Sequence, residues 1–439
     1  QGLGVFSRKY EIPIYATPGT IAGIKESSSL GKMPEGLLHP IKADHPFQLG
    51  ELDVHPFAIS HDANEPSGYR IEQGGKSVAV ATDLGKYDDY TVKNLKNLDA
   101  ILISDGYNMR YLSGFGGATG YLYISADQKV LMTDSRYTTQ AKQEAPKFAV
   151  VEVSTEKGYR ELITECIRKD QTKTIGFEDQ QMTCADFKKI SSPTKDEATW
   201  MELGEEVNLL RCIKTEEELE KVAKAEAIGD QAFQKILGDI KPGVTELTIA
   251  AKLDYYMREL GAEGNSFDTI VASGLHSAMP HAVPTAKKLE KGDFITMDFG
   301  CRYDGYCSDM TRTVVLGEAS SKQKEIYGIV LKAQMAALEQ ICAGKTGSEV
   351  DQVARGLIAE AGYGEYFGHG LGHSVGLFIH EEPRLSPKCH SVLQKNMTMT
   401  VEPGIYIPEF GGVRIEDLVV ITEKGCRNLA HSPKELIEL

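Results

Sequence analysis

The sequence lacks three features that would each place it in a special class of protein. No apolar run approaches the roughly 20 residues that a membrane-spanning helix needs. None of the eight cysteines forms a C-x-x-C pair, so reduced thiols fit the chain better than a disulfide framework. Basic residues are outnumbered, 48 Lys and Arg against 63 Asp and Glu, and the net charge of −15 argues against nucleic acid as a partner. We therefore expect a cytoplasmic protein with no membrane or nucleic-acid partner.

A signal peptide and internal repeats are also not evident. The first residue is Gln, from which we expect a start that has been cut, processed or truncated. The length of 439 residues exceeds one ordinary core, so two or three domains are expected. The apolar share of 41% and the charged share of 25% are those of a globular protein.

The most informative stretch is residues 296–313, TMDFGCRYDGYCSDMTRT. An Asp-Gly pair between two strand-like runs predicts a two-residue hairpin turn, here Asp304-Gly305. That register places Asp298 and Asp309 on one face as diagonal neighbours, with Cα atoms roughly 7–8 Å apart. Either both carboxylates face solvent or a cation lies between them. The apolar flanks of the hairpin favour a divalent-metal site.

Further polar residues follow in the carboxy-terminal region. His369 and His373 lie in HGLGH, a glycine-rich loop that lets the backbone approach a ligand. Glu402 follows the apolar run MTMTV, and Glu416 lies inside the apolar run GGVRIEDLVV. A salt bridge to Arg414 is one explanation for Glu416. The other is a shared metal site, because two Asp and two Glu carry −4 and two divalent cations carry +4. Cys301 and Cys307 lie nearby, and we interpret them as packing residues.

This region resembles the creatinase/aminopeptidase P/prolidase family of dinuclear metallopeptidases. The resemblance covers residues 98–439 and rests on D-x10-D, HGLGH, VEPGIY and RIED in that order, with YNMRYLSGFGGATGYLYIS and LMTDSRY before them. It implies an α/β (α+β) fold with a creatinase-type domain (residues 105–211) and a pita-bread catalytic domain (residues 212–439). It also implies two divalent ions, Mn²⁺ before Co²⁺, Zn²⁺ or Fe²⁺. The implied ligands are Asp298, Asp309, His373, Glu402 and Glu416.

The same resemblance implies roles for other residues. His281 and His380 match histidines that contact the substrate and the transition state, and His369 matches a motif residue that we place near the substrate. Glu402 matches a residue that also carries the proton, and Arg414 matches an Arg that supports the site. The implied reaction is attack by a metal-activated hydroxide on the peptide bond before proline. Spacing alone predicts only metal-assisted hydrolysis.

The first hundred residues have a different character. His61 and Asp83 each follow an apolar strand, where such residues are usually caps or turn formers. GVFSRKYEIPIYATPGT, FAISHDANEPSGYRI and SVAVATDLGKY resemble half of a metallo-β-lactamase-fold hydrolase of the exonuclease-like group, in which these two residues are metal ligands. The family's H-x-H-x-D-H cluster is not in the chain, so we expect residues 1–104 to be catalytically inactive. The two resemblances meet at residues 94–104, which suggests a fusion.

Three functions remain open at this point. The first is a Xaa-Pro aminopeptidase or Xaa-Pro dipeptidase that acts on proline-containing peptides, with homodimerisation possible. The second is a binding protein that retained the pita-bread fold without catalysis. The third is a fusion with residual metallo-β-lactamase-type hydrolase activity. The intact ligand set favours the first, but the sequence does not separate dipeptide from longer substrates.

Overall fold

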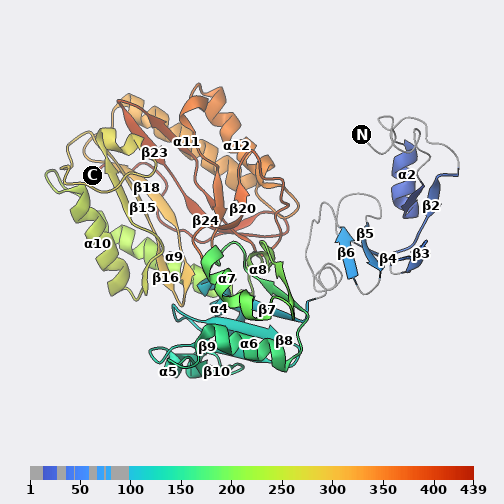
Figure 1. Ribbon diagram of the computed structural model, residues 1–439. Coiled ribbons are helices and arrows are strands. Elements are labelled where there is room, and N and C mark those ends of the chain that lie inside the picture. The colour runs from blue at the N-terminus through green and yellow to red at the C-terminus, as the bar shows by residue number, and fades with distance from the viewer. Residues whose placement is uncertain (1–12, 27–35, 44, 59–66, 74–75, 81–97) are drawn as a thin grey trace.

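A computed structural model describes residues 13–26, 36–43, 45–58, 67–73, 76–80 and 98–439 (Figure 1). His61 and Asp83 lie outside the described residues, as does most of the helix expected at 90–98. Within the described part of the chain, no helix is both long and apolar enough to cross a bilayer.

The described part of the first segment contains two small sheets. Strands β1 and β2 pair in parallel, and β3 to β6 form an antiparallel sheet in chain order. The sequence FQLGELDVHPFAI (47–59) predicts a strand-turn-strand, which is confirmed as β3 and β4. The runs at 68–71 and 77–82, separated by a Gly-Gly turn, predict two more strands, which are confirmed as β5 and β6. The elements are β1 (Ile14–Ala16), α2 (Pro18–Glu26), β2 (Leu38–Pro40), β3 (Phe47–Leu49), β4 (Leu52–Ala58), β5 (Ser67–Gln73) and β6 (Lys76–Val80).

The middle unit, residues 98–211, is a mixed six-stranded sheet with helices on both faces (Figure 1). One face packs against α6 and α7 and the other against α4 and α5, which gives two apolar clusters. The strand order is β10-β9-β8-β7-β11-β12. The elements are β7 (Ala100–Ile103), α4 (Gly106–Ser113), β8 (Tyr121–Ser125), β9 (Lys129–Thr133), α5 (Thr138–Glu144), β10 (Ala149–Glu152), α6 (Tyr159–Lys169), β11 (Thr174–Phe177), α7 (Cys184–Ser191), β12 (Thr199–Glu202) and α8 (Glu206–Leu210).

Strand β7 lies before the division expected at residue 104, yet it pairs with β8 and β11 in the interior of this sheet. Its side chains are buried or nearly so, and Leu102 and Ile103 have no exposed surface. The buried apolar run LDAILIS therefore belongs structurally to the middle unit.

The carboxy-terminal unit, residues 212–439, surrounds a set of antiparallel strands with four long helices (Figure 1). The helices are α9 (Glu216–Ile236), α10 (Glu246–Glu259), α11 (Ser321–Gln340) and α12 (Gly347–Glu360). The strands are β13 (Gly264–Asn265), β14 (Ile270–Ser273), β15 (Phe294–Phe299), β16 (Cys301–Tyr303), β17 (Tyr306–Cys307), β18 (Met310–Val315), β19 (Gly372–Ser374), β20 (Glu381–Leu385), β21 (Thr398–Val401), β22 (Gly404–Ile407), β23 (Gly411–Arg414), β24 (Asp417–Ile421) and β25 (Cys426–Asn428).

Helices of this unit begin at residues whose side chains cap the first turn. The spacing of Thr215 and Glu218 predicts a capping box at the start of α9. The capping box is present: the Thr215 side chain accepts from the Glu218 backbone N–H, and the Glu218 carboxylate accepts from the Thr215 backbone N–H. Helices α11 and α12 carry the same arrangement at Ser320 and Thr346. These pairs satisfy N–H groups that have no partner inside a helix.

Backbone geometry reveals an internal repeat in this unit. Gly243 and Gly344 both have positive φ, and each donates its N–H to the carbonyl of a leucine, Leu289 or Leu393. Both glycines precede a Thr-capped helix of 14 residues. The starts of α10 and α12 are therefore alike in backbone geometry and in their Thr cap.

The predicted hairpin is confirmed. Asp304 and Gly305 have φ of 45° and 79°, as a type I′ turn requires. The predicted pairs Tyr303–Tyr306 and Asp298–Thr311 occur, although the hairpin is split into β16–β17 at its tip and β15–β18 at its base.

Candidate metal centre

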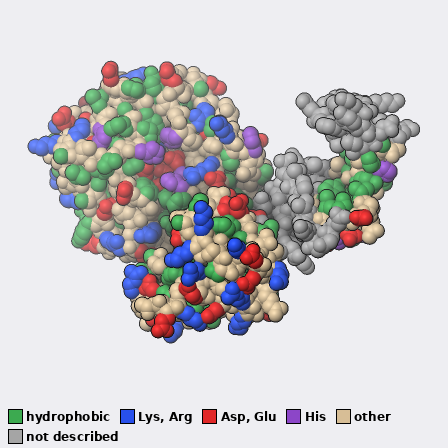
Figure 2. Space-filling view, viewed as in Figure 1, with side chains coloured by type: hydrophobic (Ala, Val, Ile, Leu, Met, Phe, Trp, Pro, Cys, Tyr) green, Lys and Arg blue, Asp and Glu red, His purple; other side chains and the backbone are tan. Residues whose placement is uncertain are grey.

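A cavity of about 500 Å³ opens in the carboxy-terminal unit. Figure 2 shows histidine side chains gathered beside acidic ones on this face of the larger unit. Every site residue predicted in residues 212–439 lines the cavity: His281, Asp298, Asp309, His369, His373, His380, Glu402, Arg414 and Glu416.

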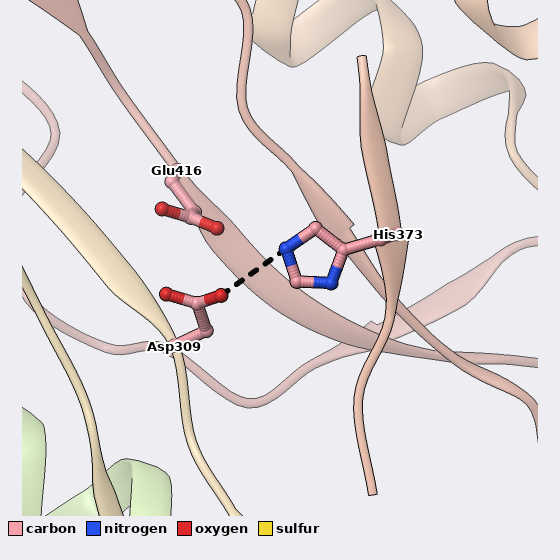
Figure 3. A group of neighbouring side chains, drawn as sticks. All are labelled: Asp309, His373 and Glu416. Atoms are coloured by element: carbon pink, nitrogen blue, oxygen red, sulfur yellow. Dashed lines mark ion pairs between the residues drawn. The ribbon is translucent and has the colours of Figure 1, made fainter. Parts of the chain in front are cut away.

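Three of these residues converge most closely. Possible ligand atoms of Asp309, His373 and Glu416 all lie within 4.8 Å of one another, although the residues come from three separate strand regions (Figure 3). His373 Nε2 is 3.4 Å from Asp309 Oδ2 and 3.5 Å from Glu402 Oε1. The fold therefore brings residues more than 100 positions apart into one charged group.

The orientation of His373 suits a ligand role. Its Nδ1 lies 3.1 Å from the carbonyl oxygen of Ser374, which can only accept a hydrogen bond. The proton is therefore on Nδ1, and the Nε2 lone pair points toward the carboxylates.

The contacts of Arg414 decide between the alternatives for Glu416. Arg414 Nη2 is 2.7 Å from Asp298 Oδ2, so the first alternative, a salt bridge from Arg414 to Glu416, is wrong. Glu416 instead accepts a hydrogen bond from Thr311 Oγ1 at 2.6 Å. The alternative of two solvent-facing aspartates is also wrong, because Asp309 is only 4% exposed.

Electrostatics show that the carboxylates need a cation. Burial and the neighbouring carboxylates raise the pKa of Asp309 and of Glu416 well above the usual value, and burial raises that of Glu402 to about 7. Two buried oxygens, Asp298 Oδ1 and Glu416 Oε1, have no hydrogen-bond partner. Oxygen-rich donors with one imidazole are typical of sites for Mn²⁺, Co²⁺, Fe²⁺ or Zn²⁺, so these residues fit a metal centre.

The remaining histidines surround this group. His380 packs edge-on against His373 with ring centroids 4.6 Å apart, and His281 is exposed at the cavity. The pKa of His380 is lowered to about 4, first by partial desolvation of its ring and then by the neighbouring His373 and Arg384. Burial and the Arg414 charge lower that of His369 to about 4 as well. His369 and His380 are therefore neutral near pH 7.

Sequence reasoning missed two side chains of the site. The Tyr406 hydroxyl accepts from Arg414 Nη1 at 2.7 Å and lies 2.9 Å from His369 Nε2, so it joins two predicted residues. Arg384 lines the cavity as a cation four residues after His380. Tyr406 lies in the quoted motif VEPGIY and Arg384 follows the sequence FIHEEP, but no local pattern points either side chain at the site.

The cysteines behave as predicted. All eight are free, and Cys301 and Cys307 are buried in apolar clusters. Burial raises the pKa of both thiols to about 12. They therefore stay protonated and pack.

Three family models match the chain. The model of metallopeptidase family M24 matches residues 220–423, and that of the creatinase/prolidase N-terminal domain matches residues 94–213. A model of the beta-lactamase superfamily domain matches residues 1–116. The last two overlap at 94–116, which includes the predicted meeting point.

Relatives and solved structures agree with these matches. The chain is 45% identical over 342 residues to the uncharacterized peptidase YqhT of Bacillus subtilis, covering 78% of this chain and 96% of that protein. It is 41% identical over 355 residues to the Xaa-Pro dipeptidase of Pyrococcus furiosus, with the same two coverages of 78% and 96%. A Xaa-Pro dipeptidase structure from Bacillus anthracis has a TM-score of 0.75 at 43% identity, covering 78% of this chain and 95% of that one. The expected fold, a pita-bread domain after a creatinase-type domain, is confirmed.

Proposed function

The chain belongs to metallopeptidase family M24, and from this membership we propose that it hydrolyses the peptide bond before proline in Xaa-Pro peptides. One observation carries the proposal: His373 and a buried set of carboxylates line one cavity, in a chain that spans 96% of a Xaa-Pro dipeptidase. Catalysis by a divalent-metal hydrolase therefore replaces the alternative of a non-catalytic binding protein.

The enzyme uses divalent metal ions, as its family implies. We propose that two ions are held, with Mn²⁺ as the expected metal, by Asp298, Asp309, His373, Glu402 and Glu416. When bound, the ions would polarise the scissile carbonyl and lower the pKa of the attacking water.

The chain's own residues supply the proton and the orientation. Glu402 lines the cavity and is fixed by a 3.0 Å hydrogen bond from Thr400 Oγ1 to its Oε1. We propose that Glu402 would accept the proton of the attacking water and then donate it to the leaving nitrogen. The neutral His380 ring and His281 line the same cavity, and we propose that they donate a hydrogen bond to the carbonyl oxygen as it becomes negative.

Three further residues orient this machinery. Arg414 binds Asp298 and Tyr406, and Tyr406 lies against the neutral His369. Arg414 Nη1 also donates to the carbonyl of Pro280 at 3.3 Å, next to His281. This network ties the loop that carries His281 to the metal ligands.

We propose a dipeptide as the preferred substrate, because Arg384 supplies a cation at the cavity for a free terminal carboxylate. The relatives named Xaa-Pro dipeptidase support this choice. Arg384→Ala should raise KM for a Xaa-Pro dipeptide at least about tenfold and leave a Xaa-Pro-Y tripeptide much less affected, on the scale of one charge-assisted hydrogen bond. Equal effects on both peptides would contradict the dipeptide assignment.

The test of the whole proposal compares two substrates and two proteins. Wild type with added Mn²⁺ should release proline from a Xaa-Pro dipeptide, and Asp298→Ala should not. Asp268→Asn is a matched control, because Asp268 lines the same cavity but is exposed and outside the buried group. Failure of wild type on both the dipeptide and the tripeptide Xaa-Pro-Y would refute the function.

The sequence predicts a division into residues 1–104, 105–211 and 212–439. Because β7 lies inside the sheet of the middle unit, we propose that this unit begins at residue 98 instead of 105. A homodimer and a cytoplasmic location remain predictions from the sequence. Residual hydrolase activity of the first segment has no support in the described residues, because His61 and Asp83 lie outside them.

A further inference from the structure

A buried ion cluster beside the metal centre holds the peptide that carries His380. The Glu381 carboxylate is 2.9 Å from Arg211 Nη1 through one oxygen and 3.0 Å from Lys214 Nζ through the other. Glu381 and Arg211 are 5% and 6% exposed, and Lys214 is 2% exposed. The Phe378 backbone N–H donates to the same carboxylate at 3.2 Å. A carboxylate with two cations and a backbone donor is held in one geometry.

The cluster reaches both ends of the segment that contains His380. Lys214 Nζ donates to Ser374 Oγ at 3.2 Å, one residue after His373, while Glu381 directly follows His380. A Cβ at Gly376 would lie 2.4 Å from Glu381 Oε2, so glycine lets the carboxylate fold back onto this segment. The segment is therefore a loop closed by Glu381 and Lys214.

The two cations come from the connection between the units. Arg211 follows α8, and its Nη2 is 3.3 Å from Asn208 Oδ1, which also accepts from Asn108 Nδ2 at 2.8 Å. Asn108 lies in α4 of the middle unit and is 2% exposed. The contacts thus run without a break from the middle unit to the residue next to His380.

We propose that Glu381 and Lys214 are positioning residues that aim the His380 ring into the cavity, and that the middle unit supports this aim through Arg211. The proposal rests on the proposed function only where it takes His380 to contact the substrate. Burying charges this far from solvent costs free energy. We therefore attribute the ion cluster to the fixed geometry that it gives this loop.

Apolar packing offers a competing explanation. Val375, Leu377 and Ile379 of the same loop are buried in one core cluster and would anchor it without any charge. If they suffice, loss of the ion cluster lowers stability but leaves the His380 ring in place. The two explanations differ in how much kcat falls on loss of the ion cluster in a variant that lacks His380.

The decisive variant is Lys214→Met, which leaves Arg211 paired with Glu381. In the Mn²⁺-loaded full chain we expect kcat for a Xaa-Pro dipeptide to fall on the order of 10–100-fold, as for loss of other supporting residues. KM should change less than about threefold. In the His380→Ala background the same substitution should lower kcat less than about twofold. An equal fall in both backgrounds would overturn the proposal.

A second measurement does not depend on activity. Ring ¹⁵N spectra of the metal-free full chain, with the His380 resonance assigned from His380→Ala, should show one His380 environment in wild type and several in Lys214→Met. Tyr123→Phe is the control, because it removes a buried hydroxyl contact in the middle unit away from the cluster. An unchanged His380 resonance in Lys214→Met would overturn the proposal even if Xaa-Pro hydrolysis, and with it the proposed function, had failed.

Discussion

Burial raises the pKa of the Asp309, Glu402 and Glu416 carboxyl groups, and neighbouring carboxylates raise each of them further, with Asp298 acting on all three. Without a cation, this part of the molecule is destabilised by its own charges. Stability and metal binding should respond in opposite directions when one carboxylate is removed.

Asp309→Asn tests this opposition. We expect metal affinity to fall by more than the roughly 10–100-fold that loss of a supporting residue costs. The free energy of unfolding of the metal-free protein should rise, because the substitution removes a buried carboxyl group whose pKa burial and Asp298 hold well above its usual value. Thermal unfolding with and without Mn²⁺, together with metal analysis, checks both. A variant that is less stable than wild type without metal would contradict the argument, and Asp268→Asn should change neither quantity.

At the scale of elements, specific contacts hold the two segments that carry residues of the candidate site. The hairpin carries Asp298 and Asp309, and its tip touches the middle unit, where Asp304 Oδ1 is 3.1 Å from Arg110 Nη2. Loop 274–285 carries His281, and its two ends are held by Glu246 at the start of α10. Each of these two elements therefore links a residue that lines the cavity to a contact far along the chain.

Gly305→Ala should cost about 1–2 kcal/mol because its φ of 79° is unfavourable for a residue with a Cβ. The new Cβ would also lie 2.2 Å from Arg110 Cζ and displace that side chain. Loss of the exposed ion pair with Asp304 adds up to about 1 kcal/mol. Gly243→Ala, with a φ of 87° and nothing within 4 Å, is the matched control for the backbone cost alone. Chemical denaturation measures both, and in an Arg110→Ala background the difference between them should vanish.

Glu246 gives a prediction about pH. Burial alone would raise the pKa of Glu246, but hydrogen bonds from Thr285, His276 and Ser273 outweigh it and lower the pKa below its usual value. A lowered carboxyl pKa stabilises the fold above the unfolded-state value of about 4.3, and that stabilisation is lost as the pH falls through the folded-state value.

Glu246→Gln should therefore lower the free energy of unfolding by about 1.5–3 kcal/mol at pH 7, the range for hydrogen bonds to a charged group. The difference from wild type should shrink below pH ~4. Urea unfolding at a series of pH values measures this difference. A difference that stays constant down to pH 3 would show that the Glu246 charge is not what holds the loop.

At the scale of the whole molecule, the candidate site draws on only part of the chain. All candidate ligands lie in the carboxy-terminal unit, and the ion cluster around Glu381 draws on the middle unit. The named strands of the first segment pair only among themselves. Figure 1 shows this segment standing away from the other two units.

A chain of residues 98–439 should fold and keep kcat/KM for a Xaa-Pro dipeptide within about twofold of the full chain. A chain of residues 105–439 should not, because it lacks β7 and leaves β8 and β11 without the strand between them. Circular dichroism and the peptidase assay on both fragments check this. Full activity of the shorter fragment would contradict the role of β7.

The sequence by itself determined the features that depend on residues close together in the chain. The Asp-Gly turn and the alternation of its flanks predicted the register that places Asp298 opposite Thr311. The spacing of Thr215 and Glu218 predicted the start of α9. The resemblance supplied the candidate ligands because they stand in short motifs.

Only the tertiary structure decided which distant groups meet. Arg414 lies two residues from Glu416 in sequence, yet it pairs with Asp298, 116 positions away. Glu381 pairs with Arg211 and Lys214, which lie about 170 positions earlier in the chain. Both outcomes depend on how strands from separate motifs are packed, since a buried charge must find its partner in the folded core and not along the chain.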